Sequence, residues 1–399
     1  MFLSFPRAWV AFLAASTLSQ LGNSVLWFAL GWAAAAHGGQ VAALVLTASG
    51  LPRLLLVLVG GSVADRVGAR RLLLCSEAVM FVVCLALAGG LHATGPQPWL
   101  LAAASLASGV VSAFSLPAMG SMPRRLVDDA VLPRALALRQ GLSQAVLLAG
   151  APLGGVLVAT VGLPAIAIAD AVCFAAVLVV LAVIRPRHHA DPSTGPLWRS
   201  LSDGARVVVG TPGLARALLL TGAMAAAVLP VSSLLVPLLG RESGWGAGAT
   251  GVVVGAQAAG SIVAALVVAR TGTTSRTGRA VGLGLTAAAA GVALVASGSG
   301  DAVTLVVGAA VVVGAGTGIA VAHLAPFVLG SAPRTHLARV QAWTSLAQLA
   351  PVVVSNNLLG ATAAWLSPSA ALLCCAAMLG MCALAAVRLR TAVPAAASA

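Results

Sequence analysis

Twelve long apolar runs dominate this chain of 399 residues, and no other feature restricts its fold as strongly. Each run is long enough to cross the hydrocarbon core of a bilayer as a helix, which takes about 20 residues. Only 8% of the residues are charged, whereas a soluble domain uses roughly 25% to cover its surface. A membrane β-barrel would instead show segments of about ten residues with alternating polarity. The sequence therefore predicts an all-α integral membrane protein with twelve transmembrane helices.

The chain contains 22 arginines and no lysine, and the distribution of the arginines predicts the topology. If the N-terminus is cytoplasmic, all but two of the 22 arginines fall on the cytoplasmic side, the exceptions being Arg53 and Arg241. The absence of Lys and the abundance of Ala, Gly and Val are typical of a high-GC bacterial genome. We therefore predict a multi-pass protein of the bacterial plasma (inner) membrane with both termini cytoplasmic. The predicted spans are Ala8–Ala36, Val41–Val63, Leu72–Leu91, Trp99–Met119, Leu136–Val161, Leu163–Ile184, Leu214–Leu239, Gly248–Ala269, Ala280–Ala296, Ala302–Leu324, Val340–Leu366 and Ser369–Val387.

A long polar stretch divides the chain into two halves. We predict a six-helix bundle over 1–184, a cytoplasmic linker over 185–213, a second six-helix bundle over 214–388 and a cytoplasmic tail over 389–399. Within the linker, Leu197–Val209 has the apolar spacing of an amphipathic helix on the membrane surface. An internal repeat supports the division, because Pro133-Arg134 and Arg139 recur at the same spacing as Pro333-Arg334 and Arg339. The two bundles are therefore expected to be pseudo-symmetric.

The stretch from Gly61 to Arg71 reads G-S-V-A-D-R-V-G-A-R-R and separates the second run from the third. We expect it to form a charged loop of about eight residues on the cytoplasmic side. The pattern resembles the signature loop between helices 2 and 3 of the major facilitator superfamily, with Ala69 at a position that is usually basic. Together with the repeat, the resemblance covers nearly the whole chain and implies the fold of that family.

The same resemblance implies a conformational latch. In the family, the motif aspartate holds this loop against helix 11 while the cytoplasmic side is closed. Helix 11 is expected to start near Val340, and a helix start carries about half a positive charge. Arg66 and Arg70 are expected to pair with acids such as Asp128 or Asp129; the alternative is a solvated loop that only sets topology. The expected latch residues are Gly61, Asp65, Arg66, Gly68, Arg70 and Arg71.

The fifth run contains a glycine–proline motif, A-G-A-P-L-G-G. Its G-x-x-x-G spacing allows a second helix backbone to approach closely, and its proline permits a kink. Ordinary tight packing is one interpretation. The motif also resembles the helix 5 motif of the exporter branch of the superfamily, best in the group that includes macrolide and siderophore exporters, and so implies export by proton-coupled antiport. Its residues are Gly150, Pro152, Gly154 and Gly155.

Polar residues inside the apolar runs are the candidates for cavity lining or proton coupling. Arg53 lies near mid-membrane, so it should face a cavity or a carboxylate. Asp170 and Glu77 are the available acids, and structural ion pairs are favoured for them over a proton relay. Interhelical hydrogen bonds are the alternative role for the amides, and a plain hydrogen-bonded ring is the alternative for the histidine. The candidates are Asn23, Trp27, Arg53, Gln144, Asp170, Gln257, His323, Gln348 and Asn356.

These features predict a secondary active transporter that exports a small, largely apolar molecule by proton antiport and alternating access. A nucleotide-driven pump needs a Walker lysine, and the chain has no lysine. No catalytic motif, metal site or nucleic-acid partner is expected, and no cofactor other than the proton gradient. The expected partners are a small-molecule substrate, protons and membrane lipid, and we expect a monomer. A proton-coupled importer of the same fold and a non-transporting membrane sensor remain as alternatives.

Overall fold

The computed structural model describes residues 5–128, 130–184, 205–274, 276–298, 303–331 and 337–388. Within these ranges the chain forms helices joined by short connections, with no β-strand, which confirms the predicted all-α class. Most of the predicted linker helix Leu197–Val209, the histidine-containing part of the linker and the tail 389–399 lie outside the described residues; 205–210 is helical.

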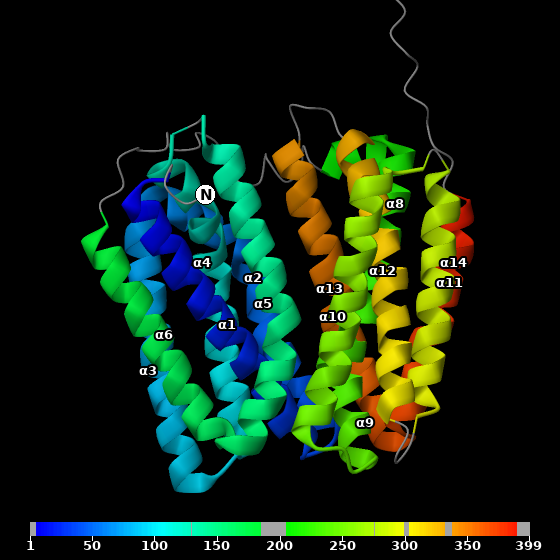
Figure 1. Ribbon diagram of the computed structural model, residues 1–399, viewed down its shortest axis with the longest axis horizontal. Helices are drawn as coiled ribbons and strands as arrows, with labels where there is room; N and C mark the ends of the chain where they lie inside the picture. Colours follow the sequence, from blue (N-terminus) through cyan, green and yellow to red (C-terminus); the bar gives the residue numbers. More distant parts are fainter. Residues whose placement is uncertain are drawn as a thin grey trace, which may run out of the picture. The chain divides into compact units, whose positions relative to one another are not determined.

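Twelve long helical segments make up the described chain (Figure 1). The seventh segment contains a π-helical turn, Val231–Leu235, directly after Pro230, and so differs from the regular helix expected over Leu214–Leu239. The first six helices are α1 (Arg7–Ala35), α2 (Gly39–Val67), α3 (Ala69–Thr94), α4 (Pro98–Leu126), α5 (Leu132–Thr160) and α6 (Gly162–Val183). The others are α8 (Pro212–Pro230), α9 (Val236–Glu242), α10 (Ala247–Thr271), α11 (Thr277–Ala296), α12 (Val303–Ser331), α13 (Leu337–Trp365) and α14 (Pro368–Val387).

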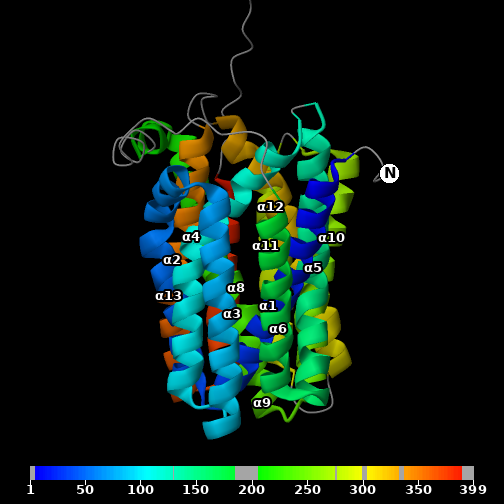
Figure 2. The same ribbon diagram turned by 90° about the vertical axis from the view of Figure 1, so that its left-hand side faces the viewer.

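Contacts group the chain into two compact units. Unit 1 comprises Met1–Thr194 with Gly240–Gly255, and unit 2 comprises Gly195–Leu239 with Ala256–Ala399. In unit 1, α1 packs on α5, and α3 packs on α4 and α6 (Figure 2). In unit 2 the equivalent helices pair in the same way, because α8 packs on α13, and α11 packs on α12 and α14. These recurring pairs are the pseudo-symmetry that the internal repeat predicts.

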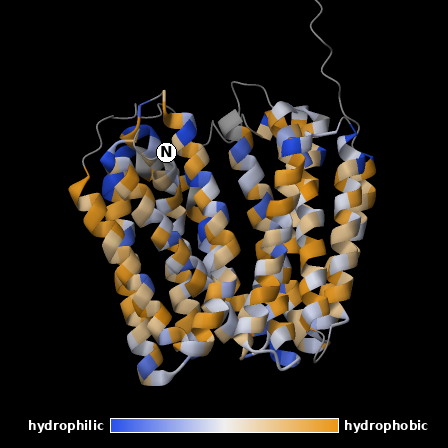
Figure 3. Ribbon diagram, in the orientation of Figure 1, coloured by the Kyte–Doolittle hydropathy of each residue, from blue (hydrophilic) through white to orange (hydrophobic). Residues whose placement is uncertain are grey.

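The helices have the length and apolarity of membrane spans. Ten of those described are long and apolar enough to cross a membrane. The other two, α1 and α13, are also 29 residues long but are not in that group. Hydrophobic residues cover most of the helix lengths in each unit, and hydrophilic residues gather mainly at helix ends (Figure 3). The chain is therefore a multi-pass membrane protein.

The prediction of a loop of about eight residues between the second and third spans is wrong. α2 continues to Val67 and α3 begins at Ala69, so the break is Gly68 alone. Gly68 has φ +91°, a conformation that glycine adopts without steric cost. The expectation failed because charge shows where a helix leaves the hydrocarbon, whereas the helix itself continues into water. For the same reason, α4 and α12 extend beyond their predicted spans at their arginine-rich ends.

An apolar cluster holds the arginine-rich end of unit 1 together. Trp9 and Phe12 on α1, Leu73 on α3, Met122 on α4 and Leu181 on α6 are all 0% exposed and belong to this cluster. Burial of large side chains stabilises by about 1.5–3 kcal/mol each in water, and here it fixes the helices that surround the cavity described next.

Candidate transport site

Unit 1 contains a cavity of about 370 Å³ between α1, α3, α4, α5 and α6. This volume lies at the small end of the range for small-molecule sites, about 300–1,000 Å³. The lining includes seven serines and four larger polar residues, and the remainder is mainly apolar. The polar lining residues are Ser16, Ser19, Gln20, Asn23, Ser76, Glu77, Ser108, Ser112, Ser115, Arg139 and Ser143. Such a surface favours a molecule that carries hydrogen-bonding groups, which differs from the largely apolar cargo expected from the sequence.

Glu77 is the acid of this cavity. Its side chain is 5% exposed, and Oε2 has no hydrogen-bond partner among the described residues. Arg139, on the same cavity wall, donates from Nη1 to the Met119 carbonyl at 3.5 Å instead of pairing with Glu77. The sequence singled out Glu77 mainly as a structural ion pair. Within the described chain it has no such pair, so it is an unpartnered carboxyl facing a polar space.

Asp170 lies behind the cavity wall, where α6 packs against α1 and α3. It is 1% exposed, and its Oδ1 lies against Gly22, where there is no room for a side chain on α1. The Cys84 thiol donates weakly to Oδ2 at 3.9 Å, and Glu77 lies on α3, the same helix as Cys84. No arginine of the described chain pairs with Asp170. The ion pair expected for this residue is therefore not found there.

The remaining polar candidates of unit 1 divide into two groups. Asn23 lines the cavity beside Gln20, whose Oε1 accepts a 2.9 Å hydrogen bond from Ser143. Trp27 is half-buried outside the lining, and Gln144 is exposed. The structure therefore brings Asn23 together with Glu77 and leaves Trp27 and Gln144 out of this cavity.

Arg53 is exposed on α2, one residue after Pro52. Across the described residues it has neither a hydrogen bond nor an ion pair with a carboxylate. The expected carboxylate partner is thus not found in the described chain.

The candidates of unit 2 differ in how far they are buried. His323 is 7% exposed, and its Nδ1 lies 2.9 Å from the Ile319 carbonyl one turn earlier. Asn356 is 5% exposed, whereas Gln348 is exposed and Gln257 is half-buried. The His323 geometry is that of the plain hydrogen-bonded histidine that the sequence left open as an alternative.

The glycines of α5 are points of close helix contact. Gly150 lies against the Ser24 hydroxyl of α1, and a methyl group on Gly154 would lie 3.0 Å from Phe28 of the same helix. Gly155 lies against the Ala247 carbonyl at the start of α10. The motif therefore lets α5 pack closely against both α1 and α10.

Two glycines of α10 pack against the glycine–proline motif of α5 within unit 1. A methyl group on Gly251 would lie 2.5 Å from the Ala151 carbonyl oxygen, and Gly255 faces the Pro152 ring. Ala151 and Gly155 on one helix thus oppose Gly251 and Gly255 on the other, with four-residue spacing on both. Small residues at this spacing let two backbones approach, as in membrane helix pairs generally.

Arg241, the arginine predicted on the outer side, also ties this part of the chain to α1. Its Nη2 donates to the Trp32 carbonyl at 3.0 Å, and its guanidinium carbon lies 4.0 Å from the centroid of the Trp32 ring. The cation–π contact and the hydrogen bond together hold the end of α9 against α1 in unit 1.

The latch residues occupy the ends of α2 and α3 around Gly68. Arg70 donates from Nε to the Leu181 carbonyl and from Nη2 to the Ala182 carbonyl, both at 2.8 Å. These carbonyls belong to the last turn of α6, where they lack helical partners and the helix dipole favours a cation. Arg70 is thus a cap for α6, and no ion pair between Arg70 and an acid is found among the described residues. The side chain of Asp65 and residue Asp129 lie outside the described part of the structure.

Membrane-crossing helices arranged as two repeats, with a polar cavity inside one of them, are the architecture of a membrane transporter. The family model of the Major Facilitator Superfamily matches residues 12–356. The chain therefore belongs to this superfamily and is one of its transporters.

Solved structures share this fold over nearly the whole chain. The nucleoside transporter NupG is 12% identical, with 96% of this chain and 99% of that chain covered and a TM-score of 0.76. A POT family transporter in complex with 5-aminolevulinic acid is 12% identical, with 96% of each chain covered and a TM-score of 0.74. A bacterial metal transporter is 16% identical, with 97% and 99% covered and a TM-score of 0.68. Identity this low shows the fold alone. No curated protein sequence matches the chain.

Proposed function

We propose that this transporter is a proton-coupled exporter that moves a small molecule out of the cell by alternating access, with both termini cytoplasmic. The observation that carries the proposal is Glu77, a buried carboxyl without an ion-pair partner among the described residues, which faces the polar cavity of unit 1. A buried charge without a partner costs several kcal/mol, and binding a proton removes this cost. A carboxyl that gains and loses a proton inside a transport cavity can couple the proton gradient to movement of cargo.

The glycine contact of α5 supports export. Gly150, Gly154 and Gly155 match the exporter motif that the sequence resembles, and each lies at a close approach to a neighbouring helix. A contact between backbones tolerates almost no change in spacing, so α5 and α10 are either in contact or clearly apart. Such a two-state contact suits a gate. The serine-lined cavity adds that the cargo carries hydrogen-bonding groups beside its apolar part.

Everted membrane vesicles test the proposal. With an imposed proton gradient, vesicles containing the protein should accumulate a fluorescent antibiotic or dye from a compound panel. Glu77→Gln keeps the shape of the side chain but cannot release a proton. It should abolish accumulation driven by the gradient and leave counterflow of the same compound without a gradient. Glu242→Gln is the matched control, because Glu242 is an exposed glutamate outside the cavity.

Three outcomes contradict the proposal in different ways. Accumulation in right-side-out vesicles alone would support the importer, and full gradient-driven uptake by Glu77→Gln would remove this residue from coupling. Absence of transport for every compound, with correctly folded protein, would favour the membrane sensor.

A further inference from the structure

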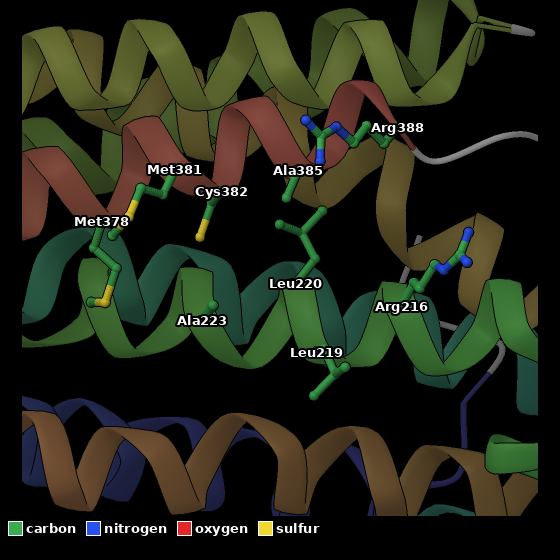
Figure 4. Close-up of a pocket in the computed structure, with 9 residues that line it drawn as sticks. All are labelled: Arg216, Leu219, Leu220, Ala223, Met378, Met381, Cys382, Ala385 and Arg388. Atoms are coloured by element: carbon green, nitrogen blue, oxygen red, sulfur yellow. The ribbon is translucent and has the colours of Figure 1, made fainter.

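A second cavity lies in unit 2, where α8 packs beside α14. Its volume is about 610 Å³, and it runs along the two helices as an open groove (Figure 4). Most of its lining is aliphatic or sulfur-containing, and two arginines complete it. The lining residues are Arg216, Leu219, Leu220, Ala223, Met378, Met381, Cys382, Ala385 and Arg388.

The apolar part of the groove faces outward from the protein. Leu219 is 75% exposed and Met381 is 64% exposed, and both lie on membrane-spanning helices. Water contact with such a surface costs about 25 cal/mol for each Å². In a membrane, the apolar material available to cover it is a hydrocarbon chain. Methionine side chains adapt to flexible partners of this kind.

The two arginines lie together at one end of the groove. α8 begins at Pro212 and α14 ends at Val387, so the antiparallel helices bring Arg216 and Arg388 to the same end. Figure 4 shows both side chains there, with Met378 at the opposite end. Both arginines are exposed, and neither guanidinium group bonds to another described residue. The described residues that line the groove include no acid. The guanidinium groups are therefore available to an anion.

The length of the groove matches one leaflet of a bilayer. Ten residues separate Met378 from Arg388, which is about 15 Å along a helix at 1.5 Å per residue. Half of a hydrocarbon core of about 30 Å is also about 15 Å. An amphiphile with its anionic head on the arginines would thus place its chain along the apolar wall down to the midplane.

We propose that this groove binds one anionic phospholipid of the leaflet at the arginine-rich end. Its phosphate accepts hydrogen bonds from Arg216 and Arg388, because guanidinium groups match phosphate oxygens in geometry and charge. One acyl chain lies between α8 and α14 on Leu220, Met381 and Cys382. Basic pockets between membrane helices on the cytoplasmic side bind anionic lipid head groups in this way. The site is separate from the cavity of Glu77, and it concerns a lipid that stays bound rather than the cargo.

Native mass spectrometry of the full chain in detergent tests the proposal with two lipids of identical chains. Dioleoyl phosphatidylglycerol should bind more tightly than dioleoyl phosphatidylcholine, which carries no net charge. The double variant Arg216→Gln/Arg388→Gln should bind phosphatidylglycerol about 30-fold more weakly, from about fivefold for each arginine near an anionic head group. The matched control is Arg270→Gln/Arg279→Gln, since these exposed arginines lie at the same end of unit 2 outside the groove and remove equal charge.

A second pair of variants tests the apolar wall. Ala385→Trp places a large ring in the groove and should weaken the binding of both lipids, whereas Ala377→Trp, on an exposed position of α14 outside it, should not. Equal affinity for the two lipids, or an equal loss in the two arginine double variants, would overturn the proposal. Elution of both double variants as wild type in size-exclusion chromatography ensures that a loss of binding reports the site rather than unfolding.

Discussion

The contact between α5 and its neighbours predicts a graded response to one added methyl group at three glycines of the same helix. A methyl group on Gly155 meets the Ala247 backbone carbonyl, and one on Gly154 meets the Phe28 side chain at 3.0 Å. Gly141 has no heavy atom of another element within 4 Å of the same methyl position. The three Gly→Ala variants therefore differ in what the methyl group touches and in little else.

The expected magnitudes follow from these contacts. Replacing glycine by alanine favours a helix by about 1 kcal/mol, and this gain is common to the three positions. A backbone oxygen cannot move without shifting α10, so Gly155→Ala carries an overpacking cost of about 1–3 kcal/mol. At Gly154 the methyl group meets Phe28 Cβ and its ring at 3.0 Å, a less severe approach than that to the Ala247 oxygen, so the cost is smaller. We expect Gly141→Ala to be the most stable variant, Gly154→Ala intermediate and Gly155→Ala the least stable, with about 1–3 kcal/mol between the first and last.

Reversible unfolding in mixed micelles, followed by helical circular dichroism, measures this order. Comparing variants of one helix cancels the propensity term, and an unchanged denaturant slope shows that only stability has changed. Equal midpoints for Gly141→Ala and Gly155→Ala would refute the reasoning. Gly251→Ala, which meets the Ala151 carbonyl from the α10 side, supplies a further check. Because both changes separate the same pair of backbones, Gly155→Ala and Gly251→Ala should be non-additive.

Three further predictions concern charged residues. Arg70→Ala should lower the free energy of unfolding by about 1–2 kcal/mol, because two charge-assisted hydrogen bonds to the end of α6 are lost at a partly exposed site. In the same unfolding assay Arg71→Ala, at the exposed neighbouring position, should change the free energy of unfolding little. Arg241→Ala should destabilise by about 1 kcal/mol through loss of the Trp32 contacts, and Arg241→Lys should recover only part of this because lysine lacks the planar fork. Asp65→Asn should leave expression intact but weaken the outward-open state, and unchanged cysteine-labelling accessibility across the membrane would contradict this.

Most of the fold was predictable from the length and apolarity of the runs. Twelve runs of spanning length predicted twelve helices, because lipid leaves a backbone segment few alternatives to hydrogen-bonding within itself. The glycine spacing of α5 likewise predicted a close contact, because only small residues admit a backbone at that distance. The helix that each glycine contacts was not predictable in the same way, because α1 and α10 both carry small residues. In the structure Gly150 contacts α1 and Gly155 contacts α10.

The failures at the ends of the helices have a common cause. The sequence shows that Arg66 and Arg70 leave the apolar phase, but helix continuation there depends on local backbone bonding, which charge does not reveal. Arg70 then bonds to carbonyls 111 and 112 residues away in sequence. Every residue carries a backbone carbonyl, so no residue type on α6 marked the partner. The position of Glu77 at a cavity, rather than in an ion pair, was missed for a related reason, since the cavity arises from five helices and no single run encodes it.

The polar residues of α1 give a signal that the sequence-based prediction of the site used only in part. α1 carries Gln20 and Asn23 within a span that the sequence otherwise marks as apolar. A polar group facing lipid is costly, so a membrane helix retains such groups where protein or water receives them. On α1 this is what the structure shows, because Gln20 and Asn23 line the cavity that contains Glu77. Two polar side chains three residues apart on one span, rather than any single residue, therefore indicate which helix lines the cavity.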